Sequence, residues 1–279
     1  MNKFTIAGAL MTLGVVGLAM WAYWPAAKAP AIVPPAPIAE TPEAQATSTQ
    51  LLIGTSVKGR EIEAYTFGTG DTNLLFVGGI HGGYEANTVR LAEAMIEEFQ
   101  LDEDVIPSSV TVHIIPNLNP DGYALPPTAA DAERRFNANS VDLNRNFDCR
   151  WKSTGTWRSV TMSAGTAPFS EPEAVALRDY VAEVNPNAAV FWHSAASEVF
   201  TSECGNGVLS STDLLMNTYA SASTYRAAGL WTAYPVSGDA EGWLANIGIP
   251  AITVELETRD SIEWERNWPA VLAILELYK

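Results

Sequence analysis

Two kinds of segment follow one another along the chain. Some are short runs that are apolar throughout or in which apolar and polar residues alternate. The others are longer stretches in which apolar residues recur at helical spacing. The short runs are too short for helices, and some of them are rich in β-branched residues, which predicts strands at 61–67, 74–77, 110–115, 188–192 and 249–256. Helical spacing predicts helices at about 84–99, 170–184, 214–230 and 264–278. Strands that alternate with helices indicate an α/β fold, with a mixed, largely parallel twisted sheet covered by helices on both faces.

The amino-terminal region departs from this pattern. Thr5 to Trp24 is a run of 20 residues without a charge, and as a helix it would cover about 30 Å, the thickness of the hydrocarbon core of a bilayer. The aromatic residues near Trp24 resemble the belt of a membrane interface. Residues 1–24 are therefore predicted to form one N-terminal transmembrane helix, an uncleaved membrane anchor. The alternative is a secretory signal peptide, for which Ala27-Lys28-Ala29 offers a cleavage pattern.

Residues 25–50 are rich in Ala and Pro and show no apolar periodicity, which is typical of an extended tether. Residues 51–279 are then predicted to form the folded domain. Lys3 precedes the apolar run and few basic residues follow it directly, so the positive-inside rule places the amino terminus in the cytoplasm. The folded domain is expected at the cell membrane, facing the periplasm or the extracellular space, or secreted if the N-terminal segment is cleaved.

Charge and cysteine content limit the function classes. The chain has 16 Lys plus Arg against 32 Asp plus Glu, a net charge of −16, which argues against nucleic acid as a partner because phosphates need a basic face. Both cysteines lie in the exported part, and an even pair in an oxidising compartment predicts a disulfide bond between Cys149 and Cys204. Two unrelated thiols, or a contribution to a zinc site, are the alternatives.

Candidate chemistry begins where a predicted strand passes into a helix, in V-G-G-I-H-G-G-Y-E-A-N (77–87). Open α/β sheets bind ligands at such strand ends, and the glycines allow a sharp turn there. His81 and Glu85 lie in this turn, and His193 ends another predicted strand in the same way. Two histidines and a glutamate would form a catalytic zinc site with one position left for water. The third histidine, His113, lies inside a strand and is interpreted as a core or supporting residue and the spare candidate ligand.

Two further features suggest chemistry. Three arginines lie between Arg134 and Arg145 in an acidic chain, which indicates a site for anions, and Arg145 with Asn144 could hold a carboxylate. The alternative is a surface loop with internal salt bridges. Glu255 lies in the apolar strand at 249–256, where burial would raise its pKa toward the range of a general base. An edge strand with Glu255 facing water is the alternative.

Several motifs together resemble the zinc carboxypeptidase family typified by carboxypeptidase A. They occur in family order from Val77 to Leu256 and read G-G-I-H-G-G-Y-E, P-N-L-N-P-D-G, R-F-N-A-N-S-V-D-L-N-R-N-F, F-S-E-P-E, F-W-H-S, Y-P-V-S-G and I-T-V-E-L. The resemblance implies the family fold over the exported domain and one Zn²⁺ bound by His81, Glu85 and His193. The family commonly spaces its first two ligands as H-x-x-E, whereas Glu85 lies one residue further from His81.

The resemblance also implies a role for each remaining candidate. Glu255 would be the general base, and Arg135 would polarise the scissile carbonyl and stabilise the oxyanion. Asn144 and Arg145 would hold the terminal carboxylate of the substrate. Tyr234 would close over the bound substrate.

The predicted function is that of a zinc metallocarboxypeptidase, which hydrolyses the peptide bond next to a free C-terminal carboxylate. Small bacterial-type relatives resemble enzymes that cut the γ-D-glutamyl–diaminopimelate bond of murein peptides, a substrate that would suit an outward-facing domain. Asp239 and Glu241 lie in the stretch that shapes the family's specificity pocket, and they suggest a substrate side chain with an amino group. The alternatives are an N-acyl amino-acid deacylase of the same fold and a catalytically inactive protein that binds wall peptides.

Overall fold

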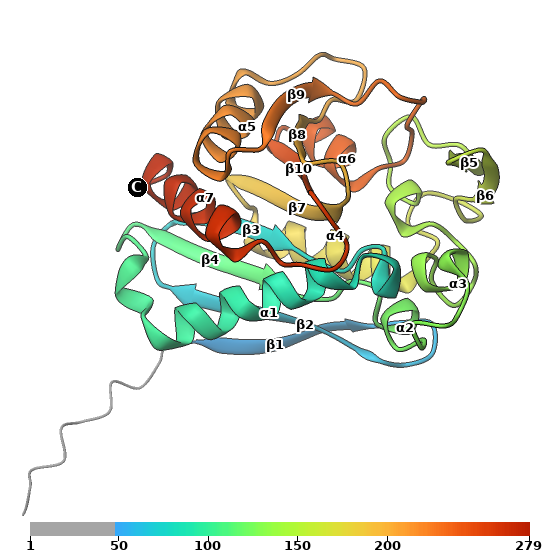
Figure 1. Ribbon diagram of the computed structural model, residues 1–279, viewed down its shortest axis with the longest axis horizontal. Coiled ribbons are helices and arrows are strands. Elements are labelled where there is room, and N and C mark those ends of the chain that lie inside the picture. Colours follow the sequence, from blue (N-terminus) through green and yellow to red (C-terminus); the bar gives the residue numbers. More distant parts are fainter. Residues whose placement is uncertain (1–47) are drawn as a thin grey trace, which may run out of the picture. The chain divides into compact units, whose positions relative to one another are not determined.

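The computed structural model describes residues 48–279, so the predicted anchor and most of the predicted tether lie outside the described residues (Figure 1). An eight-stranded sheet runs through this part of the chain in the order β1-β2-β4-β3-β7-β10-β8-β9, and β5 and β6 form a separate two-stranded sheet. Within residues 48–279, no helix is both long enough and apolar enough to cross a bilayer.

The strands of the main sheet are β1 (Thr49–Thr55), β2 (Glu61–Gly68), β3 (Thr72–Val77), β4 (Val110–Ile115), β7 (Ala188–Ser194), β8 (Glu198–Thr201), β9 (Arg226–Leu230) and β10 (Ala251–Leu256). The small sheet contains β5 (Thr154–Trp157) and β6 (Val160–Ser163). The helices are α1 (Ala86–Leu101), α2 (Pro120–Tyr123), α3 (Asp131–Arg135), α4 (Pro172–Val184), α5 (Ser210–Ser223), α6 (Ala240–Asn246) and α7 (Trp264–Leu277). Three short 3₁₀ turns are η1 (Gly82–Glu85), η2 (Glu103–Val105) and η3 (Leu143–Arg145).

Four neighbouring strands, β4, β3, β7 and β10, run parallel at the centre of the sheet. Antiparallel pairs flank them, namely β1 with β2, β2 with β4, and β8 with β10, while the edge strand β9 runs parallel to β8. The central strands are continuous apolar runs because both of their faces are covered, and every residue of β4 and β7 is buried. The mixed, largely parallel α/β sheet predicted from the sequence is confirmed.

Helices pack on both faces of the sheet and divide the core into two apolar clusters. Leu91 of α1, Leu215 of α5 and Val271 of α7 belong to one cluster. Leu177 of α4 and Leu244 of α6 belong to the other. In Figure 1, α1 and α7 lie in front of the sheet and α4 lies behind it. Each central strand is therefore sealed from water on both sides.

The register of the central strands brings the candidate catalytic residues to one edge of the sheet. β3 runs beside β7 with Val77 opposite Phe191, so the turn that carries His81 lies next to the end of β7. β10 runs along the other side of β7, with Glu255 opposite His193. Parallel strands present their carboxyl ends at the same edge, and the site is built there.

The helix predicted at 214–230 is wrong in its second half. α5 ends at Ser223, Thr224 adopts a left-handed conformation with a φ of 61°, and Arg226–Leu230 forms the edge strand β9. The alanines of this segment are compatible with helix or strand, and pairing with β8 decides between them. The short strands β5, β6 and β8 are not predicted either, because four residues carry little periodicity. The sheet also begins at Thr49, inside the stretch expected to be tether.

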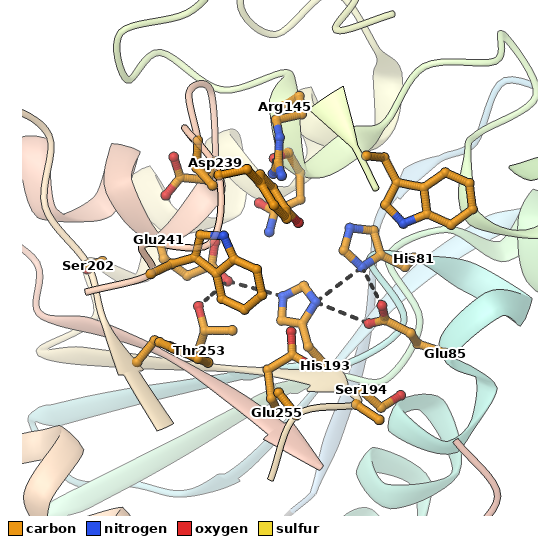
Figure 2. A pocket seen from close by; sticks show the side chains of 18 of the residues that line it. His81, Glu85, Arg145, His193, Ser194, Ser202, Asp239, Glu241, Thr253 and Glu255 are labelled. Atoms are coloured by element: carbon orange, nitrogen blue, oxygen red, sulfur yellow. Dashed lines mark hydrogen bonds and ion pairs between the residues drawn. The ribbon is translucent and has the colours of Figure 1, made fainter. Parts of the chain in front are cut away.

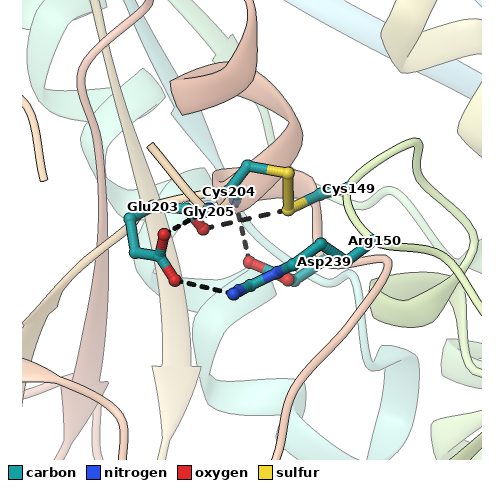
Figure 3. The surroundings of a disulfide bond; sticks show 7 residues. Cys149, Arg150, Glu203, Cys204, Gly205 and Asp239 are labelled. Atoms are coloured by element: carbon teal, nitrogen blue, oxygen red, sulfur yellow. Dashed lines mark hydrogen bonds and ion pairs between the residues drawn. A yellow bond between two sulfur atoms is a disulfide. The ribbon is translucent and has the colours of Figure 1, made fainter. Parts of the chain in front are cut away.

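The predicted disulfide bond is present between Cys149 and Cys204, whose Cα atoms are 5.6 Å apart (Figure 3). It joins the loop after η3 to the loop after β8, across a sequence separation of 55 residues. Arg150 and Glu203, the residues next to the two cysteines, form an ion pair of 2.9 Å. Figure 3 shows the carboxylate of Asp239 close to this cross-link. The disulfide bond therefore fixes one wall of the cavity described next.

Candidate active site

The residues singled out by the sequence converge on one cavity of about 530 Å³ at the carboxyl edge of the central strands (Figure 2). Its lining includes His81, Glu85, Arg135, Asn144, Arg145, His193, Tyr234 and Glu255. They come from the turn after β3, from α3, η3, β7 and β10, and from the loop after β9. The fold thus brings together every predicted site residue.

Three potential metal ligands face one another in this cavity. The Nδ1 atoms of His81 and His193 are 3.1 Å apart, and the Glu85 carboxylate lies 3.0 Å from the first and 3.1 Å from the second. All three side chains are buried. Ligand atoms around a tetrahedral zinc ion, with bonds of about 2.0–2.1 Å, are roughly 3.3 Å apart, so the three side chains have the spacing of a zinc site.

The second nitrogen of each imidazole faces a carboxylate. His193 Nε2 lies 3.1 Å from Glu241 Oε1, and His81 Nε2 lies 3.4 Å from Asp142 Oδ1. A proton held on Nε2 by the carboxylate leaves a lone pair on Nδ1. Two such lone pairs and the Glu85 carboxylate form a donor set that needs a positive charge between them, either a proton or a metal ion. The donor set therefore fits a zinc ion.

The charges around the ligands favour a cation as well. Burial opposes the charged form of His193, yet hydrogen bonds with Glu241 and Glu85 raise its pKa to about 10. Burial also disfavours the charge of Asp142, but the guanidinium of Arg135 holds the pKa of Asp142 well below its ordinary value. The surroundings of His193 thus stabilise positive charge, which a bound zinc ion would supply.

A 3₁₀ turn accommodates the unusual spacing of His81 and Glu85. η1 occupies this turn, and the helix predicted from about residue 84 begins only at Ala86. Gly82 has a φ of 47°, and a Cβ there would lie 2.8 Å from the carbonyl oxygen of Arg134, so the turn requires glycine. The turn returns Glu85 to the side of His81, and their distance of 3.0 Å is compatible with both residues as ligands.

Glu255 lies beside His193, its register partner on β7. The alternative of an edge strand is excluded, since β10 lies between β7 and β8. Burial and the neighbouring Glu85 carboxylate raise the pKa of Glu255 to about 7, although His193 and Arg135 oppose the shift. A carboxyl group with this pKa next to a metal site has the properties of a general base near neutral pH.

Arg135 is held between a metal ligand and a buried acid. Its Nε donates to Asp142 Oδ2 at 3.0 Å, and its Nη1 donates to Glu85 Oε1 at 3.4 Å. Its guanidinium carbon also lies 5.7 Å from the ring centroid of Tyr84 and 5.2 Å from that of Trp157. These contacts fix the guanidinium in the cavity, where its remaining N–H groups can reach a substrate carbonyl.

Arg145 is a buried guanidinium without an ion pair to any residue in the described part of the chain. It is 4% exposed, its Nη1 donates to the backbone oxygen of Asn144, and its Nε has no hydrogen-bond partner there. A buried charge of this kind is costly unless a ligand supplies the counter-ion. Asn144 Oδ1 accepts from the backbone N–H of Ala240 at 2.8 Å, which leaves the amide nitrogen of Asn144 to donate as well.

Tyr234 and Asp239 line the wall next to this guanidinium. Burial raises the pKa of both side chains, that of Asp239 to about 6, although Arg145 opposes the shift. The carboxylate of Asp239 accepts from the backbone N–H of Gly242 at 2.8 Å, and no side chain among residues 48–279 donates to it. Glu241, in contrast, is engaged by His193 and by Thr253 Oγ1 at 3.0 Å. Two acids are expected from the sequence to face a substrate amino group. The carboxylate of Asp239 is available for that contact, whereas the carboxylate of Glu241 is used to support a metal ligand.

The sequence does not predict the residues that support the ligands. Asp142 stands inside V-D-L-N-R-N-F, and its only signal is an acid in a motif that folds into the core. Glu241 reaches His193 from a separate element, α6, so the contact cannot be predicted from the spacing of residues in the sequence. His113 lies in β4, where its ring contacts Tyr180 Oη at 2.8 Å, and the structure places it in the core and away from the ligands.

We expect the purified protein to hold one Zn²⁺ per chain, and His81→Ala or His193→Ala to lose it because each removes a donor. Glu85→Gln should weaken binding, and Glu241→Gln should weaken it by roughly 10- to 100-fold because Glu241 orients the imidazole of His193. Zinc content and competition with a chelator measure both effects. Glu257→Gln, an exposed acid beyond β10, is the control. Equal zinc content in the wild type and both histidine variants would contradict the site.

Comparison of the sequence with known proteins agrees with a zinc site in this cavity. Residues 39–265 match the family model described as zinc carboxypeptidase. Murein peptide amidase A of Escherichia coli K12 is 27% identical over 214 residues, which cover 72% of this chain and 78% of the amidase. Carboxypeptidase B of Astacus astacus is 30% identical over 155 residues, which cover 50% of this chain and 51% of that protein.

Solved structures share the fold. Bovine thrombin-activatable fibrinolysis inhibitor, in complex with tick carboxypeptidase inhibitor, matches with a TM-score of 0.71 at 18% identity, over 83% of this chain and 89% of that chain. The murein-tripeptide amidase of Escherichia coli O157 matches with a TM-score of 0.61 at 24% identity, over 81% of this chain and 90% of that chain. At these identities the likeness concerns the fold.

Proposed function

This chain belongs to the zinc carboxypeptidase family and is a zinc metallopeptidase, and we propose that it hydrolyses the peptide bond next to a free C-terminal carboxylate. The observation that carries the proposal is Arg145, which is buried and forms no ion pair with any described residue. A substrate carboxylate that accepts from Arg145 and Asn144 would supply the missing negative charge through charge-assisted hydrogen bonds.

The catalytic step follows from the residues around that carboxylate. His81, Glu85 and His193 would hold a zinc ion, which would supply Lewis-acid chemistry to the scissile carbonyl and the attacking water. Glu255 accepts the proton of that water and transfers it to the leaving nitrogen. Arg135 donates hydrogen bonds to the carbonyl oxygen as negative charge develops on it.

We further propose that the substrate is a murein peptide, cut at its γ-D-glutamyl–diaminopimelate bond. The similarity to murein peptide amidase A, which extends over most of both chains, supports this substrate class. Asp239 supports it independently, because it lines the cavity near Arg145 and no side chain in the described part of the chain donates to its carboxylate. Diaminopimelate would give its carboxylate to Arg145 and the amino group of its side chain to Asp239.

Digestion of a defined peptide panel by the zinc-loaded protein tests the proposal. The panel contains peptides with ordinary C-terminal residues, the same peptides as C-terminal amides, a wall stem peptide and N-acyl amino acids. Release of the C-terminal residue from free acids and not from amides is expected, with the stem peptide cleaved best. A preference for N-acyl amino acids would favour a deacylase instead, and binding without turnover would indicate an inactive receptor.

We also propose that residues 1–24 anchor the protein in the membrane with the folded domain outside the cytoplasm. The uncharged run from Thr5 to Trp24 supports the anchor, and the Cys149–Cys204 disulfide supports an oxidising compartment. The full chain is expected in the membrane fraction of cells, with the tether at 25–50 cut by protease added from outside. A soluble mature protein that begins near Pro30 would show a cleaved signal peptide.

A further inference from the structure

Cationic side chains are concentrated in the cavity to a degree that the proposed mechanism does not explain. The chain has 16 Lys plus Arg and a net charge of −16. Five of those cationic residues line this one cavity, namely Arg135, Arg145, Arg150, Arg158 and Arg259. The proposed mechanism uses two of them, and Arg150 is paired with Glu203 at 2.9 Å. Arg158 and Arg259 have no role in it.

These two arginines gather around one aromatic side chain. The guanidinium carbon of Arg259 lies 4.4 Å from the ring centroid of Tyr84, and that of Arg158 lies 5.7 Å from it and 4.9 Å from that of Trp157. Arg158 Nη2 donates to Tyr84 Oη at 2.8 Å, and Arg259 Nη2 donates to the backbone oxygen of Ser194 at 2.7 Å. Both guanidinium groups are therefore held in place rather than free to sweep through solvent.

Neither guanidinium has a strong counter-ion among residues 48–279. Arg259 has no carboxylate within 4.0 Å in this part of the chain, and its charge acts on the Glu255 carboxyl group only from a greater distance. Arg158 lies 3.7 Å from the Asp131 carboxylate, but both side chains are exposed, and such pairs contribute little in water. In a chain with twice as many acids as bases, two positioned arginines that lack a strong partner are unusual. They leave N–H donors available for an anionic ligand.

The position of this pair relative to the metal ligands identifies the part of the substrate it would meet. Tyr84 directly precedes Glu85, and Ser194 directly follows His193, so the pair borders the metal site. Figure 2 shows Asp239 and Ser194 on opposite sides of His193. Because the proposed clamp takes the C-terminal residue on the side of Asp239, the other side must receive the residue whose carbonyl is attacked.

We propose that Arg158 and Arg259 bind a carboxylate carried by the substrate residue on the acyl side of the scissile bond. This inference rests on the proposed function, which fixes the direction of the substrate. A residue joined through its γ-carboxyl keeps its α-carboxylate a few bonds from the scissile carbonyl, within reach of this pair. An uncharged residue joined through its α-carboxyl has no carboxylate in the corresponding place. The pair therefore selects γ-glutamyl linkages over ordinary peptide bonds that follow an uncharged residue.

Two substrates that differ at one group test this assignment. Both carry a γ-D-glutamyl residue linked to the same C-terminal residue, and one has the free α-carboxylate whereas the other has an α-carboxamide. The wild type is expected to prefer the carboxylate by roughly 5- to 30-fold in kcat/KM, mainly through KM, since the contact exists in ground and transition states alike. Arg158→Ala with Arg259→Ala should abolish the preference, because kcat/KM should fall further for the carboxylate substrate than for the carboxamide.

Arg178→Ala is the matched control, because Arg178 is also exposed but lies on α4 and pairs with Asp179. It should keep the full preference. Equal cleavage of the two substrates by the wild type would overturn the inference, and so would an equal loss on both substrates in the double variant. Efficient cleavage of ordinary peptides without cleavage of γ-glutamyl ones would also overturn it, while the proposed carboxypeptidase function would stand.

Binding measurements separate this inference from the proposed activity. Calorimetry with Glu255→Gln protein and the same two peptides does not depend on turnover. The carboxylate peptide should bind more tightly than the carboxamide, and the double arginine substitution should remove the difference. If no peptide is cleaved but this difference persists, the proposed activity fails and the anion site stands. If both peptides bind alike, the anion site fails whatever the enzyme cleaves.

Discussion

Replacing Glu255 with glutamine is expected to lower kcat by roughly 100- to 10,000-fold while zinc content and fold are preserved. Glutamine has nearly the same shape as glutamate but cannot accept the proton of the attacking water. Glu255 is not one of the three candidate metal ligands. The substitution therefore removes proton transfer but leaves all metal donors in place. The control is Glu257→Gln, because Glu257 is exposed and pairs with Arg266 on the surface. Steady-state kinetics and metal analysis on the same preparations measure both quantities.

The pH dependence gives a second readout of the same group. A general base works only when deprotonated, so kcat/KM should fall toward acid pH as Glu255 takes up a proton. Burial and Glu85 raise the pKa of Glu255, which moves this loss toward neutrality, and a bound zinc ion would move it back toward acid. The acid limb assigned to Glu255 should be absent from the residual activity of Glu255→Gln. A variant with unchanged kcat and an unchanged pH profile would assign the base to another residue.

Replacing Arg145 with alanine is expected to lower kcat/KM for substrates with a free C-terminal carboxylate by roughly 30- to 5,000-fold, chiefly through KM. The magnitude is large because the substrate carboxylate would lose its partner in a buried site. The same substrates as C-terminal amides serve as the comparison. Wild type should strongly prefer the free acid, and Arg145→Ala should lose most of that preference.

Arg150→Ala is the matched control for this prediction, since Arg150 lines the same cavity but already has Glu203 as its counter-ion. It should keep the preference for the free acid. Equal cleavage of acid and amide by the wild type would show that Asn144 and Arg145 do not form a carboxylate clamp. The enzyme would then be an endopeptidase or an amidase of another kind.

The central strands could be predicted because their burial on two faces forces continuous apolar runs, as in β4 and β7. His193 lies beside Glu255 because two such runs pair in parallel. The sequence pattern indicates that they pair but does not give the register of the pairing. β9 could not be predicted, because its alanines permit either structure and its pairing with β8 is a long-range contact. The same holds for Glu241, whose contact with His193 depends on how α6 packs.

The turn between His81 and Glu85 shows the opposite situation. The two candidate ligands in this turn can be identified from the sequence. The extra residue between them, however, suggests a conflict with the ligand spacing of the family. A left-handed Gly82 resolves the conflict, and that conformation is decided by backbone packing against Arg134 and Tyr123. Chemistry can therefore be predicted from residue types, whereas its geometry depends on turns whose backbone is set by distant neighbours.

The cross-link between Cys149 and Cys204 makes the loop that follows Arg145 and the loop that carries Glu203 a single mechanical unit. One end lies shortly after Arg145, the other follows β8, and the closed loop contains the whole of β7. In the oxidised chain, local opening of the carboxylate clamp must displace the wall that carries Glu203 as well, so amide exchange in the two loops should be correlated. Before oxidation the loops can open separately. Joining of the two loops is thus a step that requires oxidation of the two thiols, distinct from pairing of the strands in the sheet.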